Sequence, residues 1–127
     1  MIERYFRSLL DVVARTPFVR SSDIALDQRS EFIGFIRGNV YFIDDSLLHF
    51  RKLVDVQSDV RRVMYAYHYQ RPGGALVFRY DNTDHFPGLP NFPHHKHDGN
   101  ETNVLPSAPP DFSAVLKEIE PLIAMAR

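Results

Sequence analysis

The stretch LLHFRKLVDV, residues 47–56, alternates apolar and polar side chains, and this alternation decides the fold. Successive side chains of a β-strand point to opposite faces of the sheet, so residues two apart share a face. The even positions are apolar apart from Lys52, whereas the odd positions include His49, Arg51 and Asp55. The stretch is therefore predicted to be a strand with one buried face and one polar face.

Similar short runs surround this stretch, and turn residues separate them. The predicted strands are DIALDQR, EFIGFIR, VYFI, LLHFRKLVDV, RRVMYAYHYQ and ALVFRYDN, with breaks at Gly38-Asn39, at residues 44–46 and at residues 72–74. Connections this short favour antiparallel neighbours, because parallel strands need long crossovers. We therefore expect a twisted antiparallel meander of four to six strands, in which the first run could form one bent unit with the second.

Helical patterns flank the strands. Residues 2–13 place apolar side chains at helical spacing, and this helix should end before Pro17. Asp111 can cap a second helix, which Pro121 should end or kink. Between the sheet and this helix, residues 83–110 contain six prolines and are predicted to form a long irregular loop.

The predicted fold class is therefore α+β, in one domain that spans residues 1–127. It has an N-terminal helix, an antiparallel meander sheet, a long loop rich in histidine and proline, and a C-terminal helix. Both helices are expected to cover one face of the sheet.

Composition excludes several classes of function. The 127 residues include no cysteine, which rules out disulfides, thiol catalysis and cysteine-ligated zinc. A net charge of −1 gives no strong global field toward nucleic acid, so a polyanion partner would need a local basic patch. No apolar run is long enough to span a membrane, and the N-terminus lacks a signal-peptide pattern. We expect a cytoplasmic protein with no membrane contact.

The hairpin between the last two predicted strands should gather polar side chains. Pairing Gln70 with Ala75 would make His68 and Arg79 diagonal neighbours on the polar face. Asp81 shares the face of Arg79 and could pair with it or orient a histidine. A solvated sheet face with cross-strand ion pairs would explain the same pattern without any function.

The segment NFPHHKHDGN, residues 91–100, concentrates imidazole groups at His94, His95 and His97. These histidines, with Asp98, could ligate a divalent metal such as zinc, although their spacing matches no established zinc motif. Imidazole also exchanges protons near neutral pH, so the same residues could act as acid and base in metal-independent RNA cleavage. In a third interpretation the loop docks on the domain or on a partner, and nothing reacts.

For RNA cleavage the sequence offers acids, bases and cations. The predicted catalytic residues are His95, His97, His68, Arg51 and Arg79. The arginines would stabilise charge on phosphorus. The predicted substrate-binding residues are Arg37, His49, Asp81 and Lys96. This chemistry requires no cofactor. Three tyrosines could stack on bases if exposed, although a place in the core is the simpler interpretation: Tyr65, Tyr67 and Tyr69.

Several ordered blocks resemble the TumE family, the proposed toxins of prokaryotic type II toxin–antitoxin pairs. The blocks are GFIRGNVYFIDDSLLHFRKLVDV, YAYHYQ, LVFRYDN and FPHHKH, and the similarity runs from about residue 32 to residue 97. Lys52 departs from the glutamate that we expect after HFR in many relatives. The motif positions that map onto this sequence are Arg37, Gly38, His49, Arg51, Asp55, Arg79, Asp81, His94, His95 and His97.

The resemblance implies a small cytoplasmic protein of a bacterium or archaeon, encoded beside a DNA-binding antitoxin. It would inhibit growth by acting on RNA, and two copies could form a homodimer. The function predicted from the sequence is thus an RNA-cleaving toxin that its cognate antitoxin neutralises. The competing predictions are a non-enzymatic domain that binds a protein or a metal, and a metal-dependent hydrolase built on the same histidines.

Overall fold

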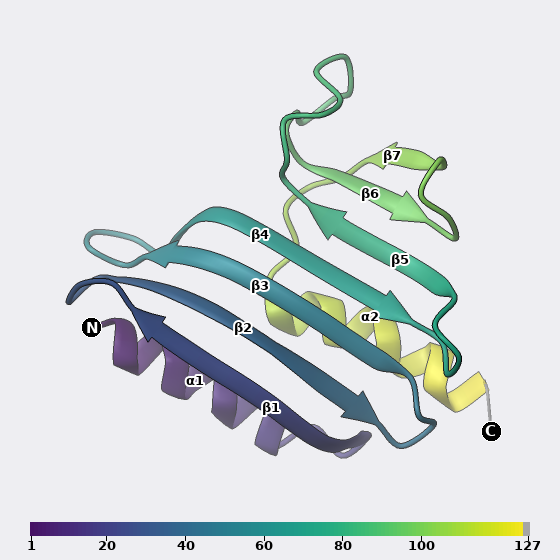
Figure 1. Ribbon diagram of the computed structural model, residues 1–127, viewed down its shortest axis with the longest axis horizontal. Helices are drawn as coiled ribbons and strands as arrows, with labels where there is room; N and C mark the ends of the chain where they lie inside the picture. The colour runs from purple at the N-terminus through teal and green to yellow at the C-terminus, as the bar shows by residue number, and fades with distance from the viewer. Residues whose placement is uncertain (126–127) are drawn as a thin grey trace.

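A computed structural model describes residues 1–125 and places two helices on one side of a seven-stranded sheet (Figure 1). The elements in chain order are α1 (Ile2–Ala14), β1 (Val19–Gln28), β2 (Ile33–Phe42), β3 (Leu47–Asp55), β4 (Arg61–Gln70), β5 (Leu76–Asp81), β6 (His95–Asp98), β7 (Val104–Pro106) and α2 (Phe112–Met125). Each strand pairs antiparallel with the next, so spatial order follows sequence order. The predicted α+β meander is confirmed, with more strands than expected. In the part of the chain described, no helix is both long and apolar enough to cross a membrane.

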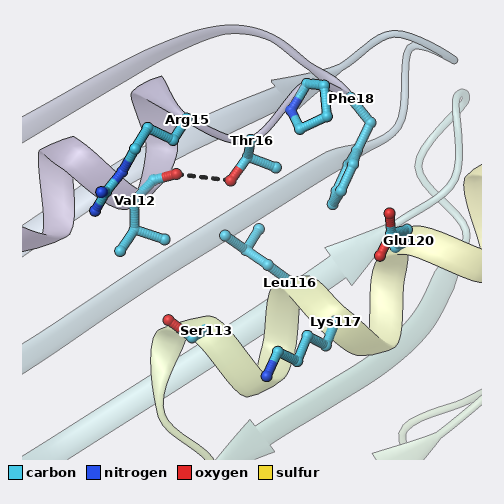
Figure 2. Close-up of a pocket in the computed structure, with 9 residues that line it drawn as sticks. Val12, Arg15, Thr16, Phe18, Ser113, Leu116, Lys117 and Glu120 are labelled. Carbon is cyan, nitrogen blue, oxygen red and sulfur yellow. Dashed lines mark hydrogen bonds between the residues drawn. The ribbon is translucent and has the colours of Figure 1, made fainter.

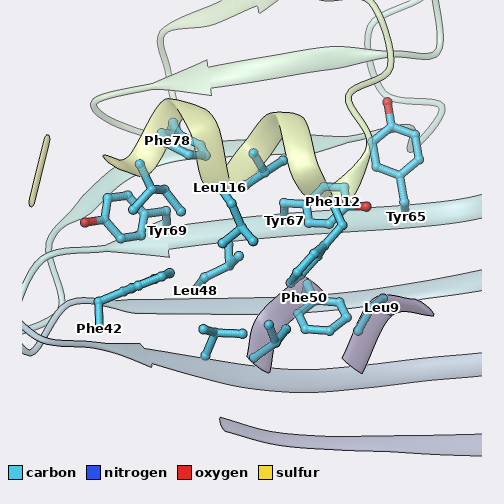
Figure 3. Packing of buried hydrophobic residues seen from close by; sticks show 14 of the residues in the cluster. Leu9, Phe42, Leu48, Phe50, Tyr65, Tyr67, Tyr69, Phe78, Phe112 and Leu116 are labelled. Carbon is cyan, nitrogen blue, oxygen red and sulfur yellow. The ribbon is translucent and has the colours of Figure 1, made fainter. Parts of the chain in front are cut away.

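The core fills the space between the sheet and the two helices (Figure 3). It takes side chains from one face of β2 to β5 and from the inner sides of both helices. The rings of Phe50 and Phe112 lie 5.0 Å apart and each contacts Tyr67, which joins α2 to the middle of the sheet. Tyr65, Tyr67 and Tyr69 are all buried in this core, so they cannot stack on RNA bases.

Gly38 and Asn39 do not break a strand as predicted, because they lie in the middle of β2. The backbone of β1 comes so close to Gly38 that a Cβ atom there would lie 2.6 Å from the Asp23 carbonyl oxygen. Glycine is needed for this close approach and not for a turn. The runs EFIGFIR and VYFI are accordingly one strand, and β1 is its separate antiparallel neighbour.

The ends of the helices follow the predicted signals in part. α1 ends at Ala14, before Pro17, and the Asp111 carboxylate accepts the Ala114 backbone N–H at 2.8 Å at the start of α2. Pro121 does not end α2, which continues to Met125. A proline removes only one intrahelical hydrogen bond, and burial of apolar side chains on both sides of it keeps α2 on the sheet.

The segment 83–110 is only partly irregular, contrary to the prediction. After a looped excursion the chain returns as β6, which pairs with β5, and β7 then pairs with β6 (Figure 1). Pro106 is the last residue of β7, which is the edge strand of the sheet, where proline is tolerated best. This return brings the histidine-rich segment into the sheet.

Candidate functional site on the polar face of the sheet

The face of the sheet away from the helices, here called the polar face, carries two rows of aligned side chains. The strand register aligns the first row in the order Asp23, Asn39, His49, His68, Arg79 and His97. It aligns the second row in the order Arg37, Arg51, Ala66, Asp81 and His95. Opposite residues of paired strands lie side by side on one face. The register therefore gathers polar groups that are far apart in the sequence.

The pairing of β4 with β5 differs from the prediction. Gln70 pairs with Leu76 and not with Ala75, and the register shifts between Tyr69 and Gln70. His68 therefore lies directly opposite Arg79 instead of diagonally from it. The change over most of the ladder is a slip of two residues, which leaves every side chain on its predicted face.

A chain of hydrogen bonds across three strands fixes the ring of His49. The Asn39 side-chain amide donates to the Asp23 carboxylate at 3.1 Å, and the Asn39 Oδ1 atom lies 2.9 Å from His49 Nδ1. Because the amide group of Asn39 is used on the carboxylate, its carbonyl oxygen faces His49, so Nδ1 must carry the proton. The Nε2 atom of His49 then holds the lone pair and can accept a proton.

The imidazoles of His49 and His68 lie opposite each other beside arginine side chains. Burial and the positive charges of Arg51 and Arg79 lower the pKa of His49. Burial and the charge of Arg79 also lower the pKa of His68. Both rings are therefore neutral near pH 7. His49 and Arg51 are exposed, while His68 and Arg79 are half-buried, so solvent reaches this part of the polar face.

Next to His49 the surface is hollowed over the first three strands. The depression has a volume of about 630 Å³, and its polar lining includes Asp23, Arg37, Asn39 and His49. Arg37 is exposed in it. The depression adjoins His49, one of the two imidazoles of the pair.

Asp81, His95 and His97 form a buried cluster at the other end of the polar face, here called the buried triad. Arg79 Nε donates to Asp81 Oδ2 at 2.9 Å, and the backbone and hydroxyl of Thr83 donate to Oδ1 at 3.1 and 2.8 Å. His95 Nε2 lies 2.9 Å from Oδ1, and His97 Nε2 lies 3.9 Å from Oδ2. Burial raises the pKa of Asp81, but these donors and the charge of His95 outweigh it and hold the pKa below its ordinary value.

Two residues of the histidine segment lie away from the buried triad. Lys96, predicted to bind substrate, points to the helix side, where it pairs with Glu118 at 2.8 Å and lies over the rings of Phe78 and Tyr80. Alternation along β6 is the reason, because Lys96 lies between the two inward-facing histidines. It therefore cannot contact a substrate on the polar face.

The metal-ligand set suggested by the sequence is also different in the structure. The ring of His94 stacks on Tyr65, and its Nδ1 atom lies 2.8 Å from the tyrosine hydroxyl. Asp98 is exposed at the end of β6. Asp81 is the carboxylate that meets His95 and His97 instead. Only the register of β5 with β6 reveals this partner.

The predicted residues on the polar face therefore form two groups. Solvent reaches the first group, which is Arg37, His49, Arg51, His68 and Arg79, whereas Asp81, His95 and His97 are buried. Sequence reasoning missed Asn39 and Asp23, which orient His49. The signal was present in the alternation of β2, where Asn39 shares the polar face with Arg37, but the expected turn at this point concealed it.

A pocket between the two helices lies on the opposite side of the sheet (Figure 2). It has a volume of about 260 Å³ and is lined by Val12 near the end of α1, by Thr16 just after that helix, and by the α2 residues Ser113, Leu116 and Glu120. Its lining holds no histidine that could serve as an acid or base. The polar face is therefore the stronger candidate site.

Comparison with known proteins supports the resemblance seen in the sequence. No curated protein and no solved structure matches the chain. The family model described as Toxin TumE matches residues 9–124, which is nearly the whole chain. This family indicates the toxin of a toxin–antitoxin system and hence an antitoxin as partner. The chain belongs to the TumE toxin family.

Proposed function

We propose that this toxin cleaves RNA and that the accessible part of the polar face is its active site. The observation that carries the proposal is the pair His49 and His68, two imidazoles with lowered pKa values that lie opposite each other. Arg51 and Arg79 flank the pair. Such a combination supplies both proton transfer and positive charge without a metal.

The chemistry follows from the tautomer of His49. RNA cleavage by attack of the 2′-hydroxyl needs a base for that proton, an acid for the departing 5′-oxygen and cations around phosphorus. His49 Nε2 would take the 2′-hydroxyl proton, and protonated His68 would give a proton to the 5′-oxygen. Arg51 and Arg79 would stabilise the negative charge on the phosphoryl oxygens. Arg37 would hold a neighbouring phosphate in the depression.

The buried triad has a supporting role in this proposal. Asp81 holds Arg79 through the Nε atom of the arginine, and Arg79 pairs with His68 in the strand register. His95 and His97 were predicted to be catalytic, but their burial favours a positioning role through Asp81. A substrate atom would have to displace protein to reach His95.

Purified protein incubated with total RNA and with ribosomes, each with and without a chelator, tests the proposal. We expect cleavage that survives the chelator and that His49→Ala and His68→Ala each abolish. His85→Ala is a matched control, because His85 is exposed outside the site. Circular dichroism would confirm that each variant folds. Loss of cleavage in the chelator, or full growth arrest by both variants, would reject this metal-independent mechanism.

The inferred antitoxin can be tested in cells that express the toxin. We infer that the antitoxin is a DNA-binding protein, as the family resemblance implies, and that it blocks the polar face. Co-expression with the product of the neighbouring gene should restore growth. Gel filtration of the toxin alone would test the inferred homodimer.

A further inference from the structure

We propose that the buried triad is a binding site for one divalent transition-metal ion, with Zn²⁺ as the best fit. The site would take its ligands from β5 and β6: one carboxylate oxygen of Asp81 and the Nε2 atoms of His95 and His97. It is separate from the imidazole pair of His49 and His68, and it does not depend on RNA cleavage.

The hydrogen bonds of the two rings determine which nitrogen faces Asp81 with a lone pair. His95 Nδ1 lies 3.0 Å from the Pro93 carbonyl oxygen, and His97 Nδ1 lies 2.9 Å from the Glu101 carbonyl oxygen. A carbonyl oxygen can only accept, so each Nδ1 carries a proton. In the neutral rings both Nε2 atoms therefore present lone pairs to Asp81. Metal-binding histidines are usually held by this kind of Nδ1–H contact.

The Nε2 atom of His95 is the observation that points most directly to a cation. It is fully buried and has no hydrogen-bond partner among the described residues, although Asp81 Oδ1 is 2.9 Å away, because the two groups are not aligned. When both rings are neutral, the Asp81 carboxylate and the two Nε2 lone pairs repel one another at these distances. A cation among them would convert the repulsion into coordination.

The geometry and chemistry of the triad fit such an ion. The three ligand atoms lie within 4.8 Å of one another. Zinc binds imidazole nitrogen at about 2.0–2.1 Å in tetrahedral sites, which places ligands about 3.3 Å apart, so small side-chain shifts suffice. Asp81 accepts three hydrogen bonds from Arg79 and Thr83 and retains a lone-pair position for a metal. The positive charge of Arg79 opposes a second cation and should weaken its affinity.

The surroundings favour retention of the ion. The ring of Phe86, from the loop before β6, lies with its centroid 4.9 Å from that of His95 and 6.0 Å from that of His97. It shields the triad from water, which strengthens electrostatic contacts inside. Two imidazoles and one carboxylate would leave a fourth position for a water molecule. Bound metal would tie the four-residue strand β6 to β5.

The test uses the full chain, stripped with a chelator and then titrated with Zn²⁺ alone in isothermal calorimetry. We expect one ion per chain and a melting temperature that rises by several degrees. His97→Gln and Asp81→Asn should each weaken binding at least about tenfold. His94→Gln is the matched control, because His94 lies beside the triad in sequence but bonds to Tyr65.

A spectroscopic readout separates metal ligation from a merely structural role. Co²⁺ in the site should give intense visible absorption in the wild type and in His94→Gln, and this absorption should be lost in His97→Gln. Melting of the metal-free variants would show that they fold. No binding of Zn²⁺ to the folded wild type, or equal binding by His97→Gln, would overturn the proposal.

Discussion

Replacement of Lys52 with methionine should stabilise the protein, by an amount that falls as the pH rises. Lys52 comes from β3 on the helix side, where its side chain is 1% exposed and its ammonium group donates to the Tyr5 hydroxyl at 2.7 Å. The rings of Tyr5, Tyr67 and Phe112 surround the ammonium. Burial, assisted by the positive charge of Arg62, lowers the pKa of Lys52 from 10.5 to about 7.

The size of the effect follows from this pKa. One pKa unit corresponds to about 1.4 kcal/mol, so burial of the charged form costs about 4 to 5 kcal/mol below pH 7. The aromatic rings around Lys52 favour the cation and offset part of this cost, so we expect methionine to gain about 2 to 4 kcal/mol at pH 6.

The sign of the pH dependence can be worked out in the same way. Between about pH 7 and pH 10.5 the lysine of the unfolded chain is protonated while the folded one is neutral. The unfolded state then binds more protons, so the stability of the wild type rises with pH in this window. The advantage of methionine should shrink to about 1 kcal/mol near pH 9.5.

Urea denaturation of the wild type and of Lys52→Met at pH 6, 7.5 and 9 measures this difference. Lys117→Met is the matched control, because Lys117 is exposed on α2 and its replacement should change the unfolding free energy little at any pH. A difference between wild type and Lys52→Met that stays constant with pH would refute the reasoning. So would a methionine variant that is less stable throughout.

Three further results are expected. The rate of RNA cleavage should be highest on the acid side of pH 6.5 and fall as the pH rises, because the lowered pKa of His68 depletes the protonated acid while His49 stays neutral; a maximum in alkaline solution would contradict this assignment. Gly38→Val should cost about 2 to 3 kcal/mol in urea denaturation, because its Cβ would meet the backbone of β1, whereas Gly88→Ala meets nothing and should be neutral. Asp111→Ala should cost about 1 kcal/mol through loss of the α2 cap, and unchanged stability would show that the cap contributes nothing.

The polar face could be predicted from the sequence because it depends only on whether a residue stands at an odd or an even position along its strand. Alternation places His49, His68 and Arg79 on one face for any strand pairing that keeps the apolar positions on the buried side. A register slip of two residues, as occurs between β4 and β5, keeps each side chain on its face. The same argument placed Lys52 on the apolar side, where it is buried.

The buried triad depends on tertiary structure that has no local signal. β6 is only four residues long, and its sequence, His-Lys-His-Asp, has little intrinsic preference for a strand. It forms because β5 offers a free edge with which it can pair. Gly38 was ambiguous for another reason: a glycine serves equally in a turn and in a close approach of two strands.

The two pairs of histidines share one face of the sheet, but their access to solvent suits them to different tasks. Proton exchange with a substrate requires rings that the substrate can reach, which favours His49 and His68. Ion binding requires fixed lone pairs and is strengthened by shielding from bulk water, which favours His95 and His97 under the ring of Phe86. If this division holds, a chelator should spare RNA cleavage, and replacement of both accessible histidines should spare metal binding. These two results could not both be obtained if all four rings served one reaction centre.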